Sequence, residues 1–274
     1  MSNSSTRKLV IVFLVLTCAL SAIFWVCIAR AGMSSTEGSL YTAGLMWCPG
    51  IAALLTAAIL QRNLRSLGWR FGKVRYLLVS YVLPIGYAAV VYGLTWVLGW
   101  GKFTVESVPA EQSLLGFVLD NATWLFLLGG LLPALGEEIG WRGFMVPQLA
   151  KLTSFTNVAL ISGAIWAVWH YPLLLFADYH TDTPRWFAVI CFTVLAMGIS
   201  FPLAWLRLRS GSLWPAAILH ASHNIYVQGV FDLLTENTGW TAYVTTEFGV
   251  GLAAMAVIVA LFFWRQRHSV QVAR

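Results

Sequence analysis

Long apolar stretches separated by short polar segments run through almost the whole chain. An apolar run of about 20 residues is long enough to cross the hydrocarbon core of a bilayer as an α-helix. Eight stretches approach this length, and they cover residues 9–29, 40–60, 76–98, 114–135, 158–176, 186–206, 213–230 and 248–264. The pattern therefore predicts an all-α fold, a polytopic membrane helix bundle with about eight transmembrane helices.

The basic residues alternate between the connecting segments in step with this count. With the amino terminus inside, the cytoplasmic segments hold 14 of the 17 lysines and arginines, and the outer side holds Arg30, Lys102 and Arg185. Nine of the eleven acidic residues fall toward the outer side. Because positive charge collects on the cytoplasmic side of membrane proteins, we predict an integral protein of the cell (inner) membrane with both termini in the cytoplasm.

Composition supports a membrane protein. Hydrophobic residues make up 59% of the 274 and charged residues only 10%, against about 25% charged residues in soluble domains. The net charge of +6 follows the basic connections, so membrane lipid, and not nucleic acid, is the expected partner. The four cysteines lie in apolar stretches without a disulfide or zinc pattern. We expect a single integral membrane domain, 1–274, with a motif-bearing core at about 114–226.

Two adjacent carboxylates, Glu137 and Glu138, follow the fourth stretch, and Arg142 comes shortly after them. Ionisable side chains inside a membrane protein are costly and mark functional sites. Glu138 and Arg142 share a helix face because residues four apart are neighbours, whereas Glu137 points about 100° away from Glu138. We expect Arg142 to neutralise and support Glu138, and Glu137 to face a cavity as a general base for water.

Two other stretches carry further polar groups. His170 lies in the fifth stretch, four residues after Trp166, which we expect to wall or support the site. In the seventh stretch His220 and Asn224 are four residues apart and project from one face, with His223 close to that face. We expect His223 to support the site or to substitute for His220.

A carboxylate, two imidazoles and an amide on three helices would converge on one water molecule or one metal ion, and two mechanisms stay open. In the first, Glu137, His170 and His220 hold a zinc ion that activates a bound water. In the second, Glu137 and His170 deprotonate the water without a metal. His220 and Asn224 then donate hydrogen bonds to the oxyanion. The HExxH and GxSxG signatures of other hydrolases do not occur in the sequence.

Three motifs together resemble those of the CAAX protease and bacteriocin-processing family. They are the Glu-Glu-x-x-x-Arg of 137–142, the aromatic-x-x-x-His of 166–170 and the His-x-x-x-Asn of 220–224, approached by a similar segment at 211–215. The resemblance implies a type II CAAX prenyl endopeptidase-like intramembrane protease. It implies a peptide or protein substrate, with or without a lipid, and four catalytic residues: Glu137, His170, His220 and Asn224. Trp166 stands where the family usually has Phe, which affects the shape of the pocket.

We expect the catalytic cavity to open toward the cytoplasm. The alternative function is a non-catalytic membrane immunity or scaffold protein that binds a peptide or a partner helix. A proton-coupled transporter is disfavoured because no inverted repeat with paired discontinuous helices is recognisable. Asp178, His180 and Asp182 gather in a predicted outer connection, which we interpret as a solvated loop and not as a metal site.

Overall fold

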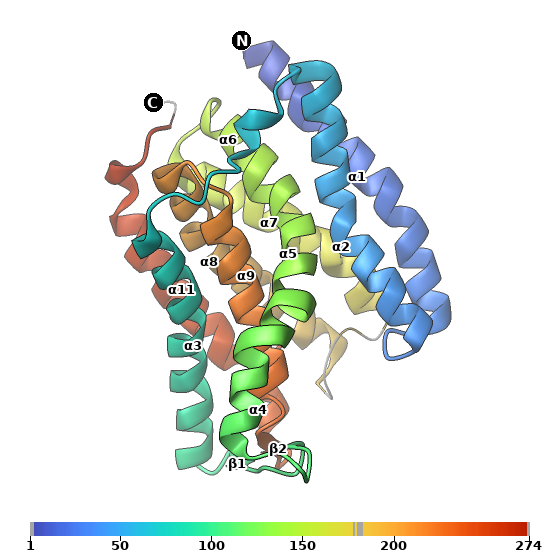
Figure 1. Cartoon of the computed structure of the whole chain (residues 1–274), viewed down its shortest axis with the longest axis vertical. Helices are drawn as coiled ribbons and strands as arrows, with labels where there is room; N and C mark the ends of the chain where they lie inside the picture. Colours follow the sequence, from blue (N-terminus) through green and yellow to red (C-terminus); the bar gives the residue numbers. More distant parts are fainter. Residues whose placement is uncertain (1–2, 178, 180–182, 273–274) are drawn as a thin grey trace.

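The computed structural model describes residues 3–177, 179 and 183–272. Over these residues the protein is a bundle of helices, and the two ends of the chain lie at the same end of the bundle (Figure 1). Six helices in the described part are long and apolar enough to cross a membrane. The prediction of an all-α membrane bundle is confirmed, and the chain is an integral membrane protein.

Seven of the eight predicted stretches each correspond to one helix. These are α1 (Asn3–Ala31), α2 (Thr36–Thr56), α3 (Val74–Val97), α7 (Phe155–Phe176), α8 (Arg185–Ser210), α9 (Trp214–Tyr226) and α11 (Val250–Arg265). Short π-helices continue two of them, α2 through Ala57–Gln61 (η1) and α9 through Val227–Phe231 (η5). With 13 residues in α9 and 16 in α11, the count of eight transmembrane helices stays a prediction for these two.

The fourth stretch continues further than the sequence predicted. One helical rod of 37 residues covers Leu114–Ala150. Its parts are α4 (Leu114–Asp120), η3 (Asn121–Leu131), α5 (Leu132–Glu138), η4 (Ile139–Met145) and α6 (Val146–Ala150). The predicted end at residue 135 was wrong because Glu138 and Arg142 pair inside the bundle, so the helix continues past them. The parts η3 and η4 are π-helical, a geometry that is frequent near functional sites.

Local sequence determines where several of these helices begin and end. Ser35, Ser113 and Ser154 precede α2, α4 and α7, and the hydroxyl oxygen of each accepts a hydrogen bond from a backbone N–H of the first turn. The helix α8 ends at Gly211, whose φ of +70° is a conformation that favours glycine. Each of these caps fixes one end of its helix, and α2, α7 and α8 among them border the main cavity.

The helix α2 crosses the fourth rod at very short range. A Cβ on Gly136 would lie 2.8 Å from the backbone oxygen of Met46, and a Cβ on Gly50 would lie 2.5 Å from the backbone oxygen of Gly136. Small residues permit such a close approach of helices in membranes. The crossing therefore fixes the position of the helical turn that carries the two adjacent glutamates.

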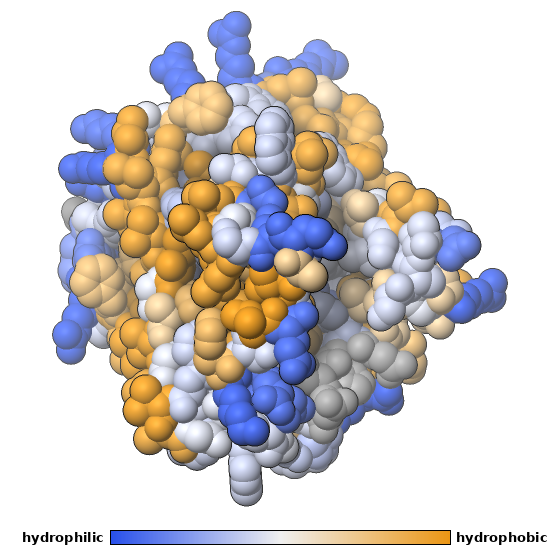
Figure 2. Space-filling view, turned by 60° about the horizontal axis from the view of Figure 1, so that its bottom comes forward, coloured by the Kyte–Doolittle hydropathy of each residue, from blue (hydrophilic) through white to orange (hydrophobic). Residues whose placement is uncertain are grey.

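The end of the bundle opposite to the chain ends carries a small sheet (Figure 1). Strands β1 (Gly101–Phe103) and β2 (Thr235–Asn237) pair antiparallel, with Lys102 opposite Glu236. The helix α10 (Thr241–Val244) follows β2. Two 3-10 helices complete the described structure, Leu64–Leu67 between α2 and α3 and Arg267–Ser269 after α11. Figure 2 brings the sheet end forward and shows a hollow between the lobe that contains the α1–α2 turn and the main body.

Candidate active site

Glu138 and Arg142 form a buried ion pair within the fourth rod. Arg142 Nη1 lies 2.7 Å from Glu138 Oε1, and neither side chain has exposed surface. Arg142 Nη2 donates a hydrogen bond to Ser200 Oγ of α8 at 3.1 Å. His220 Nδ1 of α9 lies 3.0 Å from the same Oε1 of Glu138. The pair predicted from the four-residue spacing is present, and it also ties α8 and α9 to the rod.

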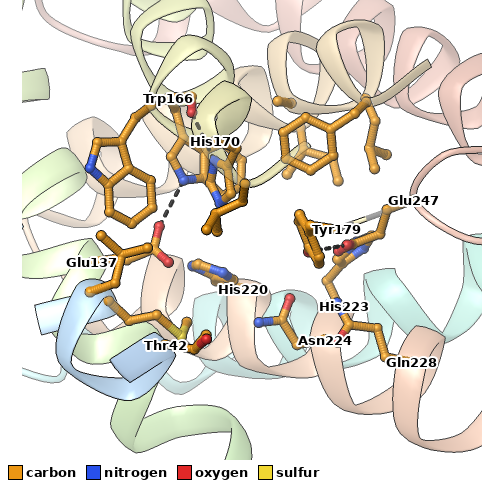
Figure 3. A pocket seen from close by; sticks show the side chains of 18 of the residues that line it. Thr42, Glu137, Trp166, His170, Tyr179, His220, His223, Asn224, Gln228 and Glu247 are labelled. Atoms are coloured by element: carbon orange, nitrogen blue, oxygen red, sulfur yellow. Dashed lines mark hydrogen bonds and ion pairs between the residues drawn. The ribbon is translucent and has the colours of Figure 1, made fainter. Parts of the chain in front are cut away.

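Glu137 points from the adjacent position into a cavity (Figure 3). The indole N–H groups of Trp166 and Trp141 donate to its Oε2 at 2.8 Å and 3.3 Å. Both bonds fall on one carboxylate oxygen, so Oε1 stays available to a water molecule. The guanidinium carbon of Arg142 lies 4.5 Å from the centre of the Trp166 ring. Trp166 is therefore held between Arg142 and the carboxylate that it orients.

His170 lies one helical turn after Trp166 in α7. Its Nδ1 is 2.9 Å from the backbone carbonyl oxygen of Trp166. A carbonyl oxygen only accepts hydrogen bonds, so Nδ1 carries the hydrogen and the neutral ring keeps its lone pair on Nε2. The helix thereby selects the tautomer that can accept a proton from water. Figure 3 shows Glu137, His170 and His220 arranged around one end of the cavity.

His220 and Asn224 are one turn apart on α9, and both line the cavity (Figure 3). A carboxylate oxygen only accepts hydrogen bonds, so His220 Nδ1 donates to Glu138 and its Nε2 is the nitrogen left for a substrate. The structure thus brings all four predicted catalytic residues to one cavity: Glu137, His170, His220 and Asn224. Their catalytic roles stay predictions.

The cavity has a volume of about 160 Å³, and its walls are largely apolar. Its apolar lining includes Leu45, Leu173, Phe192, Leu195 and Ile199. Binding sites for organic ligands commonly combine such walls with a few well-placed polar groups. The arrangement suits an apolar side chain that sits next to a polar reaction centre.

A second polar cluster lines the same cavity, and of its members the sequence analysis had named only His223. Glu247, in the connection between α10 and α11, is 6% exposed. Its Oε1 lies 3.0 Å from His223 Nε2, and its Oε2 accepts a hydrogen bond from Tyr179 Oη at 2.6 Å. Burial favours the neutral acid, but the hydrogen bond and charge of His223, with the bond from Tyr179, lower the pKa of Glu247 to about 2. Glu247 is therefore an anion in the cavity wall.

His223 has both ring nitrogens occupied. Its Nδ1 is hydrogen-bonded to the hydroxyl of Tyr87 on α3, and its Nε2 is bonded to Glu247. It lines the cavity and offers no free nitrogen to substitute for His220, and its supporting role stays a prediction. A weak sequence signal for this cluster was present, because Glu247 is a single acid at the edge of the last apolar stretch.

Tyr179 connects this second cluster to His170. Its ring stacks near His170, with the ring centres 6.3 Å apart and the planes inclined by 26°. Burial above all, and then the charge of Glu247, raise the pKa of Tyr179 well above its usual value, so its hydroxyl keeps the proton that it donates to Glu247. The nearby residues of the predicted solvated loop lie outside the described part of the chain: Asp178, His180 and Asp182.

The predicted metal ligands do not form a metal site in this geometry. Across the described residues, no three His, Cys, Asp or Glu side chains are placed to hold one metal ion. The side chains of Glu137, His170 and His220 are thus not gathered around one ion position in this geometry, and zinc binding stays a prediction.

The cavity lies toward the end of the bundle opposite to the chain ends. Its partly exposed lining includes Met33 in the α1–α2 turn and Thr42 in the second turn of α2, and Gln228 of η5 is exposed. Trp141 and Arg142, both buried, close the other side. Cytoplasmic termini and a cavity that opens to the cytoplasm therefore exclude each other in this structure. With both termini in the cytoplasm, as the basic residues predict, the cavity opens away from the cytoplasm, opposite to the direction expected from the sequence.

These features define a class, an integral membrane protein with a carboxylate, two imidazoles and an amide around one apolar cavity. Residues 119–226 match the model of a family described as type II CAAX prenyl endopeptidase Rce1-like. A protein of Methanococcus maripaludis named CAAX prenyl protease 2 is 31% identical over 115 residues, which are 40% of this chain and 41% of that protein. The chain thus spans about two fifths of this curated relative. Residues 119–226 are therefore similar to the family that the three motifs resemble.

Proposed function

We propose that the protein is an intramembrane endopeptidase in which Glu137 and His170 activate a water molecule. The observation that carries the proposal is a pair of proton acceptors at one cavity, the unoccupied Oε1 of Glu137 and the Nε2 lone pair of His170. The family match of residues 119–226 supports a protease. Water is added across the C–N bond of a peptide, which gives a carboxylic acid and an amine.

In the first step Glu137 takes a proton from the water as the oxygen attacks the carbonyl carbon. Trp166 orients the carboxylate through Oε2, so the other oxygen faces the water. His170 accepts a hydrogen bond from the same water through Nε2 and holds it in line. Glu137 later gives the proton to the leaving amine. General bases of this kind contribute about 10²- to 10⁴-fold to a rate.

His220 and Asn224 supply the hydrogen bonds to the developing oxyanion. Local charge balance supports a protonated His220, because Arg142 is the one guanidinium that pairs with the two adjacent buried carboxylates, Glu137 and Glu138, while the buried Arg207 binds backbone oxygens. An imidazolium makes the group neutral, and buried charges are tolerated when they are paired. In this form Nδ1 donates to Glu138 while Nε2 donates to the oxyanion. Donors positioned in this way are usually the largest electrostatic contribution to acyl transfer.

The substrate is a peptide or protein with an apolar residue next to the cut bond, because the cavity walls are apolar. The name of the relative refers to prenylated substrates, so substrates with and without a lipid belong in the test. Membrane lipid surrounds the bundle, where apolar side chains such as Ile11, Val15 and Trp124 are exposed. The basic connections support an orientation in the cell membrane with both termini on the cytoplasmic side.

The test combines elemental analysis of the purified protein with cleavage of prenylated and unprenylated peptide libraries. We expect cleavage that chelators do not change, and a loss of about 10²- to 10⁴-fold in Glu137→Gln. Glu111→Gln is the matched control, because Glu111 is exposed at the sheet end of the bundle. Stoichiometric zinc with chelator-sensitive cleavage would support the metal mechanism instead. Biological activity that persists in Glu137→Gln would support a non-catalytic binding protein.

A further inference from the structure

The two ends of the bundle carry opposite charges. The α2–α3 and α6–α7 connections, the end of α8 and the end of α11 lie toward the end that holds both chain ends, and their basic residues include Arg62, Arg65, Arg70, Lys73, Arg75, Lys151, Arg209, Arg265 and Arg267. The acidic residues at the sheet end include Glu37, Glu106, Glu111, Asp120 and Glu236. Positive charge collects on the cytoplasmic side of membrane proteins, so the sheet end faces away from the cytoplasm.

A buried layer closes the cavity toward the basic end. Glu138 and Arg142 have no exposed surface, and Trp141 beside them is 1% exposed. Arg207 fills the space behind this layer, where its Nε donates to the backbone oxygen of Arg142 and its Nη2 to that of Ser66, both at 2.9 Å. The basic α2–α3 connection is thereby tied onto the layer. These buried side chains and hydrogen bonds lie between the cavity and the basic end.

The cavity opens at the acidic end. Met33 and Thr42 from the α1–α2 hairpin are partly exposed at its rim, and Gln228 of η5 is exposed on the other side. Figure 2 shows this end hollowed between the lobe of the α1–α2 turn and the main body. The buried Glu137 and His170 lie at the inner end of the same cavity.

We infer that the substrate is a polypeptide segment on the extracytoplasmic side of the membrane, with an apolar side chain next to the cut bond. The inference rests on the proposed endopeptidase function and adds the side from which the substrate arrives. The segment enters between the α1–α2 turn and η5 and places its apolar side chain against Leu195 and Ile199. A cytoplasmic carboxyl terminus, prenylated or not, does not reach Glu137 by this route.

The side of the opening is tested by cysteine labelling in intact cells that express the full chain. In the background protein alanine replaces the four natural cysteines: Cys18, Cys27, Cys48 and Cys191. Single cysteines are introduced by Gln228→Cys at the opening, Glu111→Cys at the acidic end and Arg65→Cys at the basic end. A membrane-impermeant maleimide is added before or after the cells are opened. We expect Gln228→Cys and Glu111→Cys to react in intact cells, and Arg65→Cys to react only in opened cells.

The inference is overturned if Gln228→Cys reacts only after the cells are opened, or does not react at all. Labelling needs no catalysis and is repeated with Glu137→Gln, so the expected labelling without any peptidase activity refutes the proposed function alone. In an active protein we expect the maleimide adduct at Gln228→Cys to abolish cleavage and the adduct at Glu111→Cys to leave it unchanged. Equal peptidase activity of the two labelled variants also contradicts the inference.

Discussion

The two polar clusters that border the cavity are built in different ways. The inner cluster contains Glu138, Arg142 and His220, which come from fixed helix positions and are buried. The outer cluster contains Glu247 and Tyr179, which come from connections between helices, and is completed by His223 of α9. One cluster closes the cavity toward the basic end, whereas the other lies near its opening.

This difference separates two tasks of a site inside a membrane. Catalytic groups need rigid support, and side chains on packed helices give it more reliably than side chains on loops. Connections between elements vary more easily and often carry the contacts that select a ligand. We therefore expect substitutions in the inner cluster to affect folding and every substrate, and substitutions in the outer cluster to have smaller effects.

The largest effect is expected from Arg142→Met. Removing one partner of a buried ion pair leaves the adjacent carboxylates of Glu137 and Glu138 with one positive charge too few, which costs about 3–5 kcal/mol. The exposed Arg209 provides the control, because Arg209→Met removes a charge from the surface and should change stability by at most about 0.5 kcal/mol. Thermal unfolding in detergent micelles measures both.

A double variant tests whether the cost comes from the unpaired charge. Glu138→Gln combined with Arg142→Met removes both charges and keeps an acceptor for His220. We expect the double variant to be more stable than Arg142→Met alone, because buried pairs replaced together cost little. Equal stabilities would contradict the assignment of the cost to the charge of Glu138.

The inner cluster was predictable from sequence because its main contact is local. Glu138 and Arg142 are four residues apart, and a helix places such residues together in any fold. The same spacing put His220 and Asn224 on one face. The boundary of the fourth rod was not predictable, because an apolar run ends at the first charge while the helix continues through charges that pair.

The outer cluster and the direction of the opening needed tertiary structure. Tyr87, Tyr179, His223 and Glu247 come from four separate parts of the chain, and no spacing rule connects them. The alternation of basic residues predicted an orientation for the whole chain, but it did not predict how deep in the membrane the site lies. Which end of the cavity is closed depends on how Trp141 and Arg207 pack, and this packing follows from the arrangement of the helices.

The second largest effect is expected for Glu247→Gln, and it should depend on pH. The pKa of Glu247 is lowered from 4.5 to about 2 in the folded protein, so its ionised form contributes stability above pH 4.5. This contribution is lost as the pH falls through 2, and linkage limits it to about 3 kcal/mol. Melting temperatures of wild type and variant should differ most above pH 4.5 and converge toward pH 2. Parallel curves would contradict an ionised Glu247, and Glu111→Gln is the exposed control.

A smaller effect is expected at the helix crossing that supports the inner cluster. In Gly136→Ala the new Cβ would lie 2.8 Å from the backbone oxygen of Met46, and overpacking of this kind costs about 1–3 kcal/mol. Gly129→Ala lies in the same rod with nothing within 4 Å of its Cβ, so it should be neutral or stabilising by about 0.5–1 kcal/mol. Unfolding in micelles compares them, and equal stabilities of the two variants would show that the close helix crossing imposes no packing cost at Gly136.

The smallest effect is expected for Tyr179→Phe, which keeps the ring near His170 and removes one hydrogen bond to Glu247. A single hydrogen bond contributes about 0.5–1.5 kcal/mol. Because the two residues are in contact, Tyr179→Phe and Glu247→Gln should be non-additive, with a combined loss smaller than the sum of the single losses. Tyr243→Phe, on α10, serves as the control. If Tyr179→Phe instead removed cleavage as fully as Glu137→Gln, the hydroxyl would belong to the reaction centre, and the expected contrast between the inner and outer clusters would be wrong.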